Sequence, residues 1–225
     1  MQESKLLRVG DSTIVVEFPQ RIDPIIHARV LALAARIRQT VPEGVRDIIE
    51  SYCAVTVEFD PLRTDIDHVI KLLKSKIEEQ EVAKSSREIT LPICYGGEYG
   101  PDLECVAKFA KCSEAEVIET HLSRDYLVYM LGFRPGFAYM GSVDSRIAIP
   151  RRGTPRLRVP IGSVGLAGHQ TGIYPSAGPG GWHLIGRSPA TLFDPESNEP
   201  FLLRGGDVVS FKSITRQEFS DRVGV

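Results

Sequence analysis

The sequence predicts an α+β protein of two domains, a small α/β domain over residues 1–85 and a β-barrel or sandwich over residues 86–225. Three observations support this division. The 225 residues suffice for two domains of about 100 residues each. Strand-like stretches alternate with helical spacing in the first half. Beyond Tyr126 the helical spacing disappears, and residues 132–186 contain 12 of the 20 glycines, which is typical of short strands joined by tight turns.

The first domain begins with a strand and a helix. Residues 12–18 are rich in β-branched side chains and follow a Gly-Asp turn signal. Asp23 is a typical N-cap, and Pro24 suits the first helical position. The residues that follow place apolar side chains on one helical face at Ile26, Val30, Leu33 and Ile37. Two strands are then expected, over residues 45–50 and 54–59.

A second helix and a further strand complete the first pattern. The helix is expected to open at Thr64, with Asp67 as the acid of a capping box. Residues 87–93 resemble a strand, so the order is β-α-β-β-α-β, that of ferredoxin-like domains. Residues 6–9 would add a small hairpin strand. We interpret His27 and His68 as surface residues and expect no catalytic group in this half.

The second half begins with a short helical region over residues 101–122, in which Ser113 and Glu116 form a capping box. Tight turns account for much of the glycine content that follows. The expected strands are short apolar stretches at residues 126–133, 147–149, 159–167, 183–185 and 208–211.

Charge and cysteine content exclude several classes of protein. The 27 basic and 29 acidic side chains give a net charge of -2, which provides no overall attraction to nucleic acid or anionic membrane. The four cysteines form no CxxC pair, so neither a disulfide framework nor a metal site is expected. The first ten residues lack the apolar core of a signal peptide, and a cytoplasmic location is expected.

Arginine replaces lysine throughout the middle of the second half. No lysine occurs between Cys112 and Phe211, whereas arginines stand at 124, 134, 146, 151, 152, 156, 158, 187 and 204. A planar guanidinium suits carboxylate or phosphate better than a mobile ammonium does. The pattern favours a site for an anionic ligand. The alternative is a set of surface arginines paired with acids from elsewhere in the fold.

A glycine-rich run over residues 162–181 supplies a second candidate site. Small residues let backbone N–H groups approach a ligand closely. His169, Gln170 and Tyr174 add polar groups, and Trp182 follows as the only tryptophan and a candidate pocket floor. Alternatively, the glycines are structural corners, and Tyr174 and Trp182 are core residues. A third candidate is Arg134, which stands in a proline-glycine turn flanked by aromatic residues.

Several mechanisms are excluded by missing motifs. The sequence has no GxxxxGK[ST] phosphate loop, no GxSxG nucleophile elbow and no HExxH zinc motif. Cys94 could act as a nucleophile, but at a strand end a cysteine is more often a small buried hydrophobe. Residue types alone therefore indicate a barrel that binds a small anion.

Four segments carry a resemblance to a known family. They are GFRPGFAYM (132–140), VPIGSVGLAGHQTGIYP (159–175), PGGWHLIGRSPATLFDP (179–195) and RGGDVVSF (204–211). The chain resembles the family of KipI and the B subunit of 5-oxoprolinase, also called allophanate hydrolase subunit 1, whose carboxyltransferase-type domain also occurs at the end of urea carboxylases. The resemblance implies a cyclophilin-like β-barrel after the small N-terminal domain.

The resemblance also implies an enzyme subunit that is inactive alone. It would act with a homologous partner, the C subunit of 5-oxoprolinase, and with the A subunit. The complex would use ATP, with Mg²⁺, to open 5-oxoproline to L-glutamate. The alternatives are a KipI-type inhibitor of a sensor histidine kinase, or a subunit of an allophanate or urea-amide hydrolase.

The candidate site residues are carried over by motif. His169 and Gln170 are expected to orient the amide or a water as catalytic residues. The binding set, in which arginines hold anionic groups and the glycine run shapes the pocket, comprises Arg134, Arg151, Arg152, Arg158, Tyr174, Gly180 and Trp182. The chain departs from the family at Gly178, where a serine commonly precedes the Pro-Gly-Gly-Trp segment.

Overall fold

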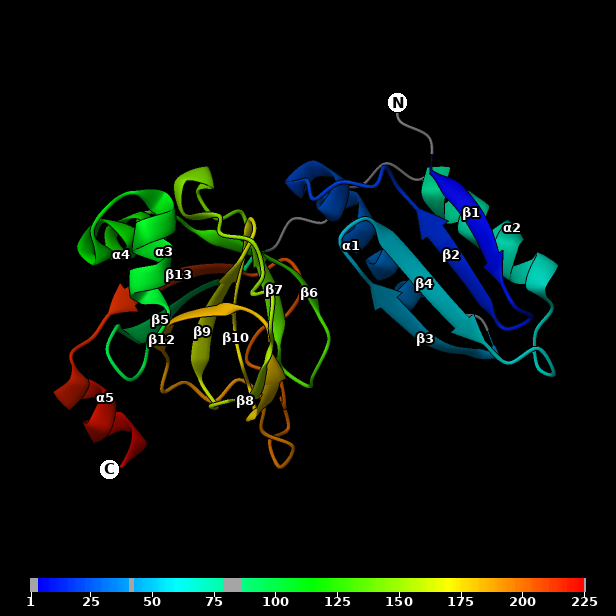
Figure 1. The fold of residues 1–225 in the computed structure, drawn as a ribbon. Helices are drawn as coiled ribbons and strands as arrows, with labels where there is room; N and C mark the ends of the chain where they lie inside the picture. Colours follow the sequence, from blue (N-terminus) through cyan, green and yellow to red (C-terminus); the bar gives the residue numbers. More distant parts are fainter. Residues whose placement is uncertain (1–3, 41–42, 79–85, 225) are drawn as a thin grey trace. The chain divides into compact units, whose positions relative to one another are not determined.

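A computed structural model describes residues 4–40, 43–78 and 86–224. The chain divides into two compact units, Met1–Ser85 and Ser86–Val225 (Figure 1). The last residues before the expected domain junction, 79–85, lie outside the described residues. Each unit has its own hydrophobic core, so each is described by itself.

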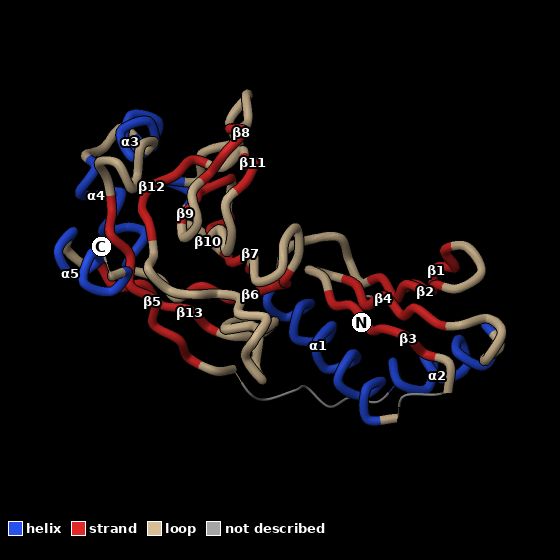
Figure 2. The backbone as a smooth tube through the Cα atoms, turned by 90° about the horizontal axis from the view of Figure 1, so that it is seen from below, coloured by secondary structure: helices blue, strands red, loops and turns tan. Residues whose placement is uncertain are grey.

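The N-terminal unit is a four-stranded antiparallel sheet with both of its helices on one face (Figure 2). Its elements, in chain order, are β1 (Lys5–Val9), β2 (Thr13–Glu17), α1 (Pro24–Gln39), β3 (Val45–Glu50), β4 (Ala54–Phe59) and α2 (Ile66–Glu78). The spatial strand order is β1-β2-β4-β3. Alternate residues of β2 and β4 are buried because successive side chains of a strand point to opposite faces.

The two helices of this unit begin at aspartate caps. Asp23 accepts hydrogen bonds from the Ile25 and Ile26 amides at 2.8 and 3.3 Å, as the sequence predicts for α1. For α2 the expected start at Thr64 is wrong by one residue. The Asp65 carboxylate accepts the Asp67 amide at 2.8 Å, and thus caps the helix in place of Thr64.

The expected ferredoxin-like order is not confirmed, because its last strand lies elsewhere. The predicted strand at residues 87–93 forms β5 (Glu88–Tyr95), which belongs to the barrel of the second unit. In the N-terminal sheet, β1 pairs antiparallel with β2 and forms that edge of the sheet. The hairpin strand predicted at residues 6–9 is thus present as β1. It occupies the position beside β2 in which the last strand of a ferredoxin-like domain would pair.

His27 corrects a second expectation for this unit. Its side chain on α1 is only 1% exposed, so it is not a surface histidine, whereas His68 on α2 is exposed. Together with Ile26 and Val30, the residue is one of the buried positions of α1. Its burial shows that a polar residue can occupy the packed face of an amphipathic helix.

The C-terminal unit is built around a closed barrel with the strand order β10-β7-β6-β13-β5-β12-β9 (Figure 1). The strands are β5, β6 (Tyr126–Leu131), β7 (Ala138–Gly141), β9 (Ser163–Ala167), β10 (Gln170–Ile173), β12 (His183–Arg187) and β13 (Val208–Ser213). A separate two-stranded sheet pairs β8 (Arg156–Val159) with β11 (Gly178–Gly180). The barrel expected from the sequence is confirmed, with seven strands in the described part of the chain.

Helices α3 (Leu103–Ala110) and α4 (Glu114–Leu122) pack against the barrel, and α5 (Arg216–Val223) follows β13. The predicted capping box of α4 is present, with Ser113 and Glu116 bonded reciprocally. The strand expected at residues 147–149 is wrong, because Ser145–Ile147 forms a short 3-10 helix, η1. Its apolar residue Ile147 is buried all the same. Among the helices of the described residues, none combines the length and the hydrophobicity that a membrane-spanning helix requires.

A polar chain crosses the barrel core at His121, at the end of α4. Its Nδ1 lies 2.7 Å from the Tyr95 hydroxyl, its Nε2 lies 3.0 Å from Thr171 Oγ1, and its ring stacks on Phe211 at 4.9 Å. Both ring nitrogens therefore have partners although the residue is fully buried. Burial lowers the pKa of His121 from 6.5 to about 3. The imidazole is neutral in the folded protein near neutral pH.

Candidate functional site

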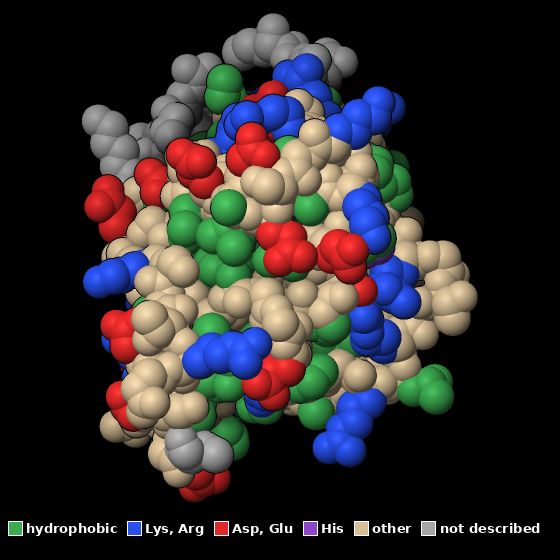
Figure 3. Space-filling view, turned by 60° about the vertical axis from the view of Figure 1, so that its left-hand side comes forward, with side chains coloured by type: hydrophobic (Ala, Val, Ile, Leu, Met, Phe, Trp, Pro, Cys, Tyr) green, Lys and Arg blue, Asp and Glu red, His purple; other side chains and the backbone are tan. Residues whose placement is uncertain are grey.

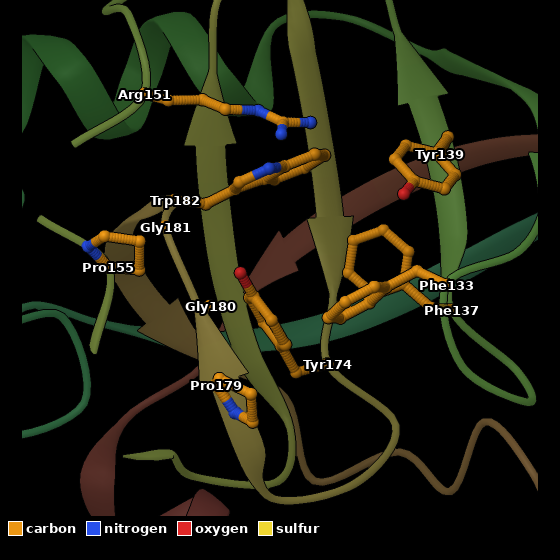
Figure 4. Close-up of a pocket in the computed structure, with 10 residues that line it drawn as sticks. All are labelled: Phe133, Phe137, Tyr139, Arg151, Pro155, Tyr174, Pro179, Gly180, Gly181 and Trp182. Atoms are coloured by element: carbon orange, nitrogen blue, oxygen red, sulfur yellow. The ribbon is translucent and has the colours of Figure 1, made fainter. Parts of the chain in front are cut away.

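A pocket of about 240 Å³ opens beside the β8–β11 sheet (Figure 4). Five of its ten lining residues are aromatic, and a single cation faces it in the described part of the chain. The lining residues are Phe133, Phe137, Tyr139, Arg151, Pro155, Tyr174, Pro179, Gly180, Gly181 and Trp182. The volume lies below the roughly 300–1,000 Å³ of pockets for drug-sized ligands, so a small molecule is the fitting occupant.

Phe137 is the centre of the aromatic wall. Its ring makes edge-to-face contacts with Tyr139 at 4.8 Å, Tyr174 at 5.3 Å and Trp182 at 5.4 Å between centroids. Phe137, Tyr174 and Trp182 are at most 4% exposed, so they are core residues that also present ring surface to the pocket. Trp182 is therefore both a core residue and part of the pocket floor, the two interpretations that the sequence leaves open. Rigid rings of this kind form a preorganised apolar floor.

The absence of a side chain at Gly180 leaves the space that the Tyr174 side chain occupies beside the pocket. A Cβ at position 180 would stand 2.5 Å from the Tyr174 hydroxyl oxygen and 2.8 Å from its ring. Burial raises the pKa of Tyr174, while a hydrogen bond with the Trp182 backbone and the charge of Arg151 partly oppose this. The phenol therefore stays protonated near neutral pH and can donate a hydrogen bond.

Arg151 supplies the positive charge of the pocket. Its guanidinium carbon lies 5.9 Å from the Trp182 ring centroid, and the side chain extends across the indole towards Tyr139 (Figure 4). The residue is exposed, and no hydrogen bond or ion pair joins its side chain to another described residue. A guanidinium held against an aromatic face and open to solvent can accept an anionic group.

Arg134 has a different role, although the sequence groups it with the binding residues. Its Nη1 donates to the Ala177 carbonyl at 2.8 Å and lies 3.3 Å from both the carbonyl and the hydroxyl of Ser176. It thereby fixes the loop that leads into β11. A Cβ at Gly178 would stand 2.0 Å from Arg134 Nη2, so the glycine at this position leaves room for the guanidinium.

Arg152 and Arg156 are bound by a buried carboxylate that sequence reasoning did not single out. Asp102, 5% exposed, accepts Arg152 Nη1 at 2.9 Å and two nitrogens of Arg156 at 2.7 Å each. Burial opposes its ionisation, but hydrogen bonds from Arg156 and the Leu184 amide hold the pKa of Asp102 below its usual value. No local signal could have found this contact, because the partners are 50 and 54 residues apart.

Other arginines that the sequence assigns to an anion site are also paired with an acid or lie outside the pocket. Asp144 binds Arg124 at 2.7 Å and Arg146 at 3.0 Å, and the hydrogen bonds from Arg146 hold its pKa well below the usual range. Arg158 is exposed on β8 and is not among the residues that line the pocket. On the face seen in Figure 3, basic and acidic side chains are interspersed. Much of the basic segment is thus paired with acids, as the alternative interpretation held.

The structure does not bring His169 and Gln170 to the aromatic pocket. They stand at the start of β10, whereas Tyr174 follows its other end, and four residues of extended strand span about 13 Å. His169 is exposed, and its Nδ1 lies 3.2 Å from the Val143 carbonyl. Of the candidate residues, the pocket therefore unites Arg151, Tyr174, Gly180 and Trp182.

Comparison with known proteins agrees with this architecture. Residues 4–203 match the family of the carboxyltransferase domain, subdomain C and D, which defines the class of the protein. The chain is 42% identical to the B subunit of 5-oxoprolinase from Bacillus subtilis, covering 94% of this chain and 93% of that protein. It is 40% identical to the B subunit of 5-oxoprolinase from Escherichia coli O157:H7, covering 94% and 96%. The chain therefore belongs to the family of the 5-oxoprolinase B subunits.

A solved structure shares this fold within a longer chain. The crystal structure of TTHA0988 matches with a TM-score of 0.81 and 36% sequence identity. The match covers 90% of this chain but only 40% of that chain. The relative thus carries further sequence beside the part that corresponds to this protein.

Proposed function

We propose that this chain is the B subunit of an ATP-dependent 5-oxoprolinase complex, which opens the cyclic amide of 5-oxoproline to L-glutamate. The observation that carries the proposal is a sequence identity of 36–42%, over 92–94% of this chain, to proteins named as B subunits of 5-oxoprolinase. The chain would act in the cytoplasm with a homologous C subunit and with the A subunit, and would be inactive alone. The longer chain of TTHA0988 is consistent with a second part that accompanies this fold.

The aromatic pocket is the proposed site for the lactam. 5-Oxoproline is a small ring that carries one carboxylate, and the pocket offers one guanidinium above an aromatic floor. Arg151 would bind the carboxylate, while Trp182 and Phe137 would pack against the ring. The protonated Tyr174 hydroxyl could donate to the lactam carbonyl, which would orient the amide for ring opening.

The described residues of this pocket do not fit ATP. A triphosphate needs several convergent positive charges, and Arg151 is the only cation among the described residues that line the pocket, because Arg152 and Arg156 are bound by Asp102. We therefore assign ATP and its Mg²⁺ to the other subunits. The part of the reaction that falls to this chain is to hold and orient the lactam. Because Arg151 is exposed, one of the partner subunits could cover the open side of the pocket.

Reconstitution with the cognate partner subunits tests the function. Glutamate release that depends on ATP, on 5-oxoproline and on this chain is the expected result. Arg151→Ala should reduce kcat/KM by about 10- to 100-fold, because a hydrogen bond to a charged group contributes about 1.5–3 kcal/mol. Arg222→Ala, which removes an exposed arginine of α5, should leave activity unchanged.

Two outcomes would contradict the proposal in different ways. If the complete set of subunits released no glutamate, or released it equally well without this chain, the function would be wrong. If the wild-type complex were active and Arg151→Ala were indistinguishable from Arg222→Ala, the function would stand, but the assignment of the pocket to the lactam would be wrong.

A further inference from the structure

The carboxylate of Asp102 joins three parts of the C-terminal unit without lining the pocket. Asp102 directly precedes α3, and its backbone amide donates to the Leu184 carbonyl of β12 at 2.9 Å. Its Oδ2 accepts the Leu184 amide at 2.7 Å in return. Together with the bonds from Arg152 and Arg156, the side chain accepts four hydrogen bonds. A buried carboxylate bonded in this way is a rigid centre.

The two arginines that Asp102 holds border one wall of the pocket. Arg151 immediately precedes Arg152, and Pro155 immediately precedes Arg156, so both lining residues of this segment neighbour a fixed residue. The Arg152 amide also donates to the Gly181 carbonyl at 2.9 Å, which ties the segment to the wall that bears Trp182. The residue that follows Arg151 is therefore held at both its side chain and its backbone.

We propose that Asp102 is a positioning residue, which holds the segment 151–156 so that the Arg151 guanidinium stays over Trp182 and faces the pocket. The role in substrate binding rests on the proposed function, whereas the positioning of the wall does not. Removing the charge of Asp102 leaves two guanidiniums near 25–30% side-chain exposure without their anionic partner. They would turn towards solvent and draw the segment away from the indole.

The single tryptophan provides a direct test in the intact chain. Trp182 is the only tryptophan and lies in the pocket, so its fluorescence reports on this site alone. Asp102→Asn keeps the shape of the side chain but replaces one acceptor with an N–H donor that faces the arginines. We expect quenching by acrylamide to rise on the order of two-fold as the segment loosens.

Asp144 offers a matched control. It is 8% exposed and binds two arginines, Arg124 and Arg146, but it borders η1 and not the aromatic pocket. Asp144→Asn should leave the quenching of Trp182 at the wild-type value. Equal quenching in the wild type and in Asp102→Asn, or an equal increase in both aspartate variants, would overturn the proposal.

Kinetics of the reconstituted complex add a second readout. A displaced Arg151 should raise KM for 5-oxoproline by about 10-fold in Asp102→Asn, with a smaller change in kcat. If the wild-type complex were inactive with 5-oxoproline, the proposed function would fail while the quenching result would still decide the positioning role. If the complex were active and Asp102→Asn kept the wild-type KM and quenching, the positioning role would fail.

A second variant covers the case in which Asp102→Asn does not fold. Arg152→Gln combined with Arg156→Gln removes the two cations and retains the bond between Asp102 and the Leu184 amide. This variant should show the same increase in quenching. Wild-type quenching in the folded double variant would overturn the proposal.

Discussion

At the scale of single residues, the arginines beside the pocket have two different roles. Arg134 and Arg152 bind carbonyl or carboxylate oxygens of this chain and shape the loops beside the pocket. Arg151 lines the pocket and lies over the Trp182 ring, and its side chain makes no hydrogen bond or ion pair with the described residues. A planar guanidinium suits both tasks, so residue type alone does not separate structural arginines from those that bind a ligand.

The close approach of Gly180 to Tyr174 gives a prediction for stability. Gly180→Ala should lower the free energy of unfolding by about 1–3 kcal/mol, because the added methyl group meets a Tyr174 ring that is buried and cannot move aside. Gly153→Ala is the control, since a Cβ there meets nothing within 4 Å. It should be neutral or slightly stabilising. Urea unfolding followed by circular dichroism measures both, and equal stability of the two variants would show that position 180 has room.

At the scale of secondary-structure elements, β5 decides where one unit ends and the next begins. It pairs in parallel with β13 over six residues and antiparallel with β12, so it closes the barrel. Strand propensity at residues 87–93 correctly indicates a strand. It carries no information on which sheet the strand joins, because that depends on partners about 90 and 120 residues later in the chain.

Fragments of the chain test this assignment of β5. A fragment of residues 86–225 keeps all seven barrel strands and should unfold cooperatively, with Trp182 fluorescence as the probe. A fragment of residues 96–225 lacks β5, leaves edges of β12 and β13 unpaired, and should not fold. Cooperative unfolding of the shorter fragment would contradict the role of β5 in closing the barrel.

At the scale of the whole molecule, the net charge of -2 does not show that the protein contains buried histidines whose protonation is coupled to unfolding. Burial lowers the pKa of His121 to about 3, and it also lowers the pKa of His183. The unfolded chain binds protons at these histidines near pH 6.5, whereas the folded chain does so only at lower pH. Their contribution to stability is therefore fully present above pH 6.5 and is lost as the pH falls below it, in the case of His121 down to about pH 3.

We expect the free energy of unfolding to fall between pH 6.5 and pH 4.5, with a limiting slope of about 1.4 kcal/mol per pH unit for each fully shifted histidine. His121→Gln retains a hydrogen-bonding side chain but does not titrate, so its slope should be smaller. Urea unfolding of the full chain at several pH values, followed by Trp182 fluorescence, measures the slope. An unchanged slope in the variant would show that His121 does not cause the dependence.

Much of the secondary structure could be predicted because its causes are local. The Asp23 cap, the capping box at Ser113 and Glu116, and the strands at residues 45–50 and 54–59 all depend on residues close together in the sequence. The pocket was predictable only in part. The motifs indicate Arg151, Tyr174, Gly180 and Trp182, but the contact of Asp102 with the arginines spans 50 or more residues and leaves no pattern.

The sequence by itself determined the family, the expectation of a barrel, and the segments from which the pocket is built, because motifs and periodicity are properties of neighbouring residues. Tertiary structure alone decided which sheet β5 joins, that His27 is buried, and that His169 lies at the far end of β10 from Tyr174. It also decided which arginine lines the pocket. The sequence shows the number and the positions of the arginines. Only the folded chain shows which of them form ion pairs with carboxylates, because a partner such as Asp102 lies far away in the sequence.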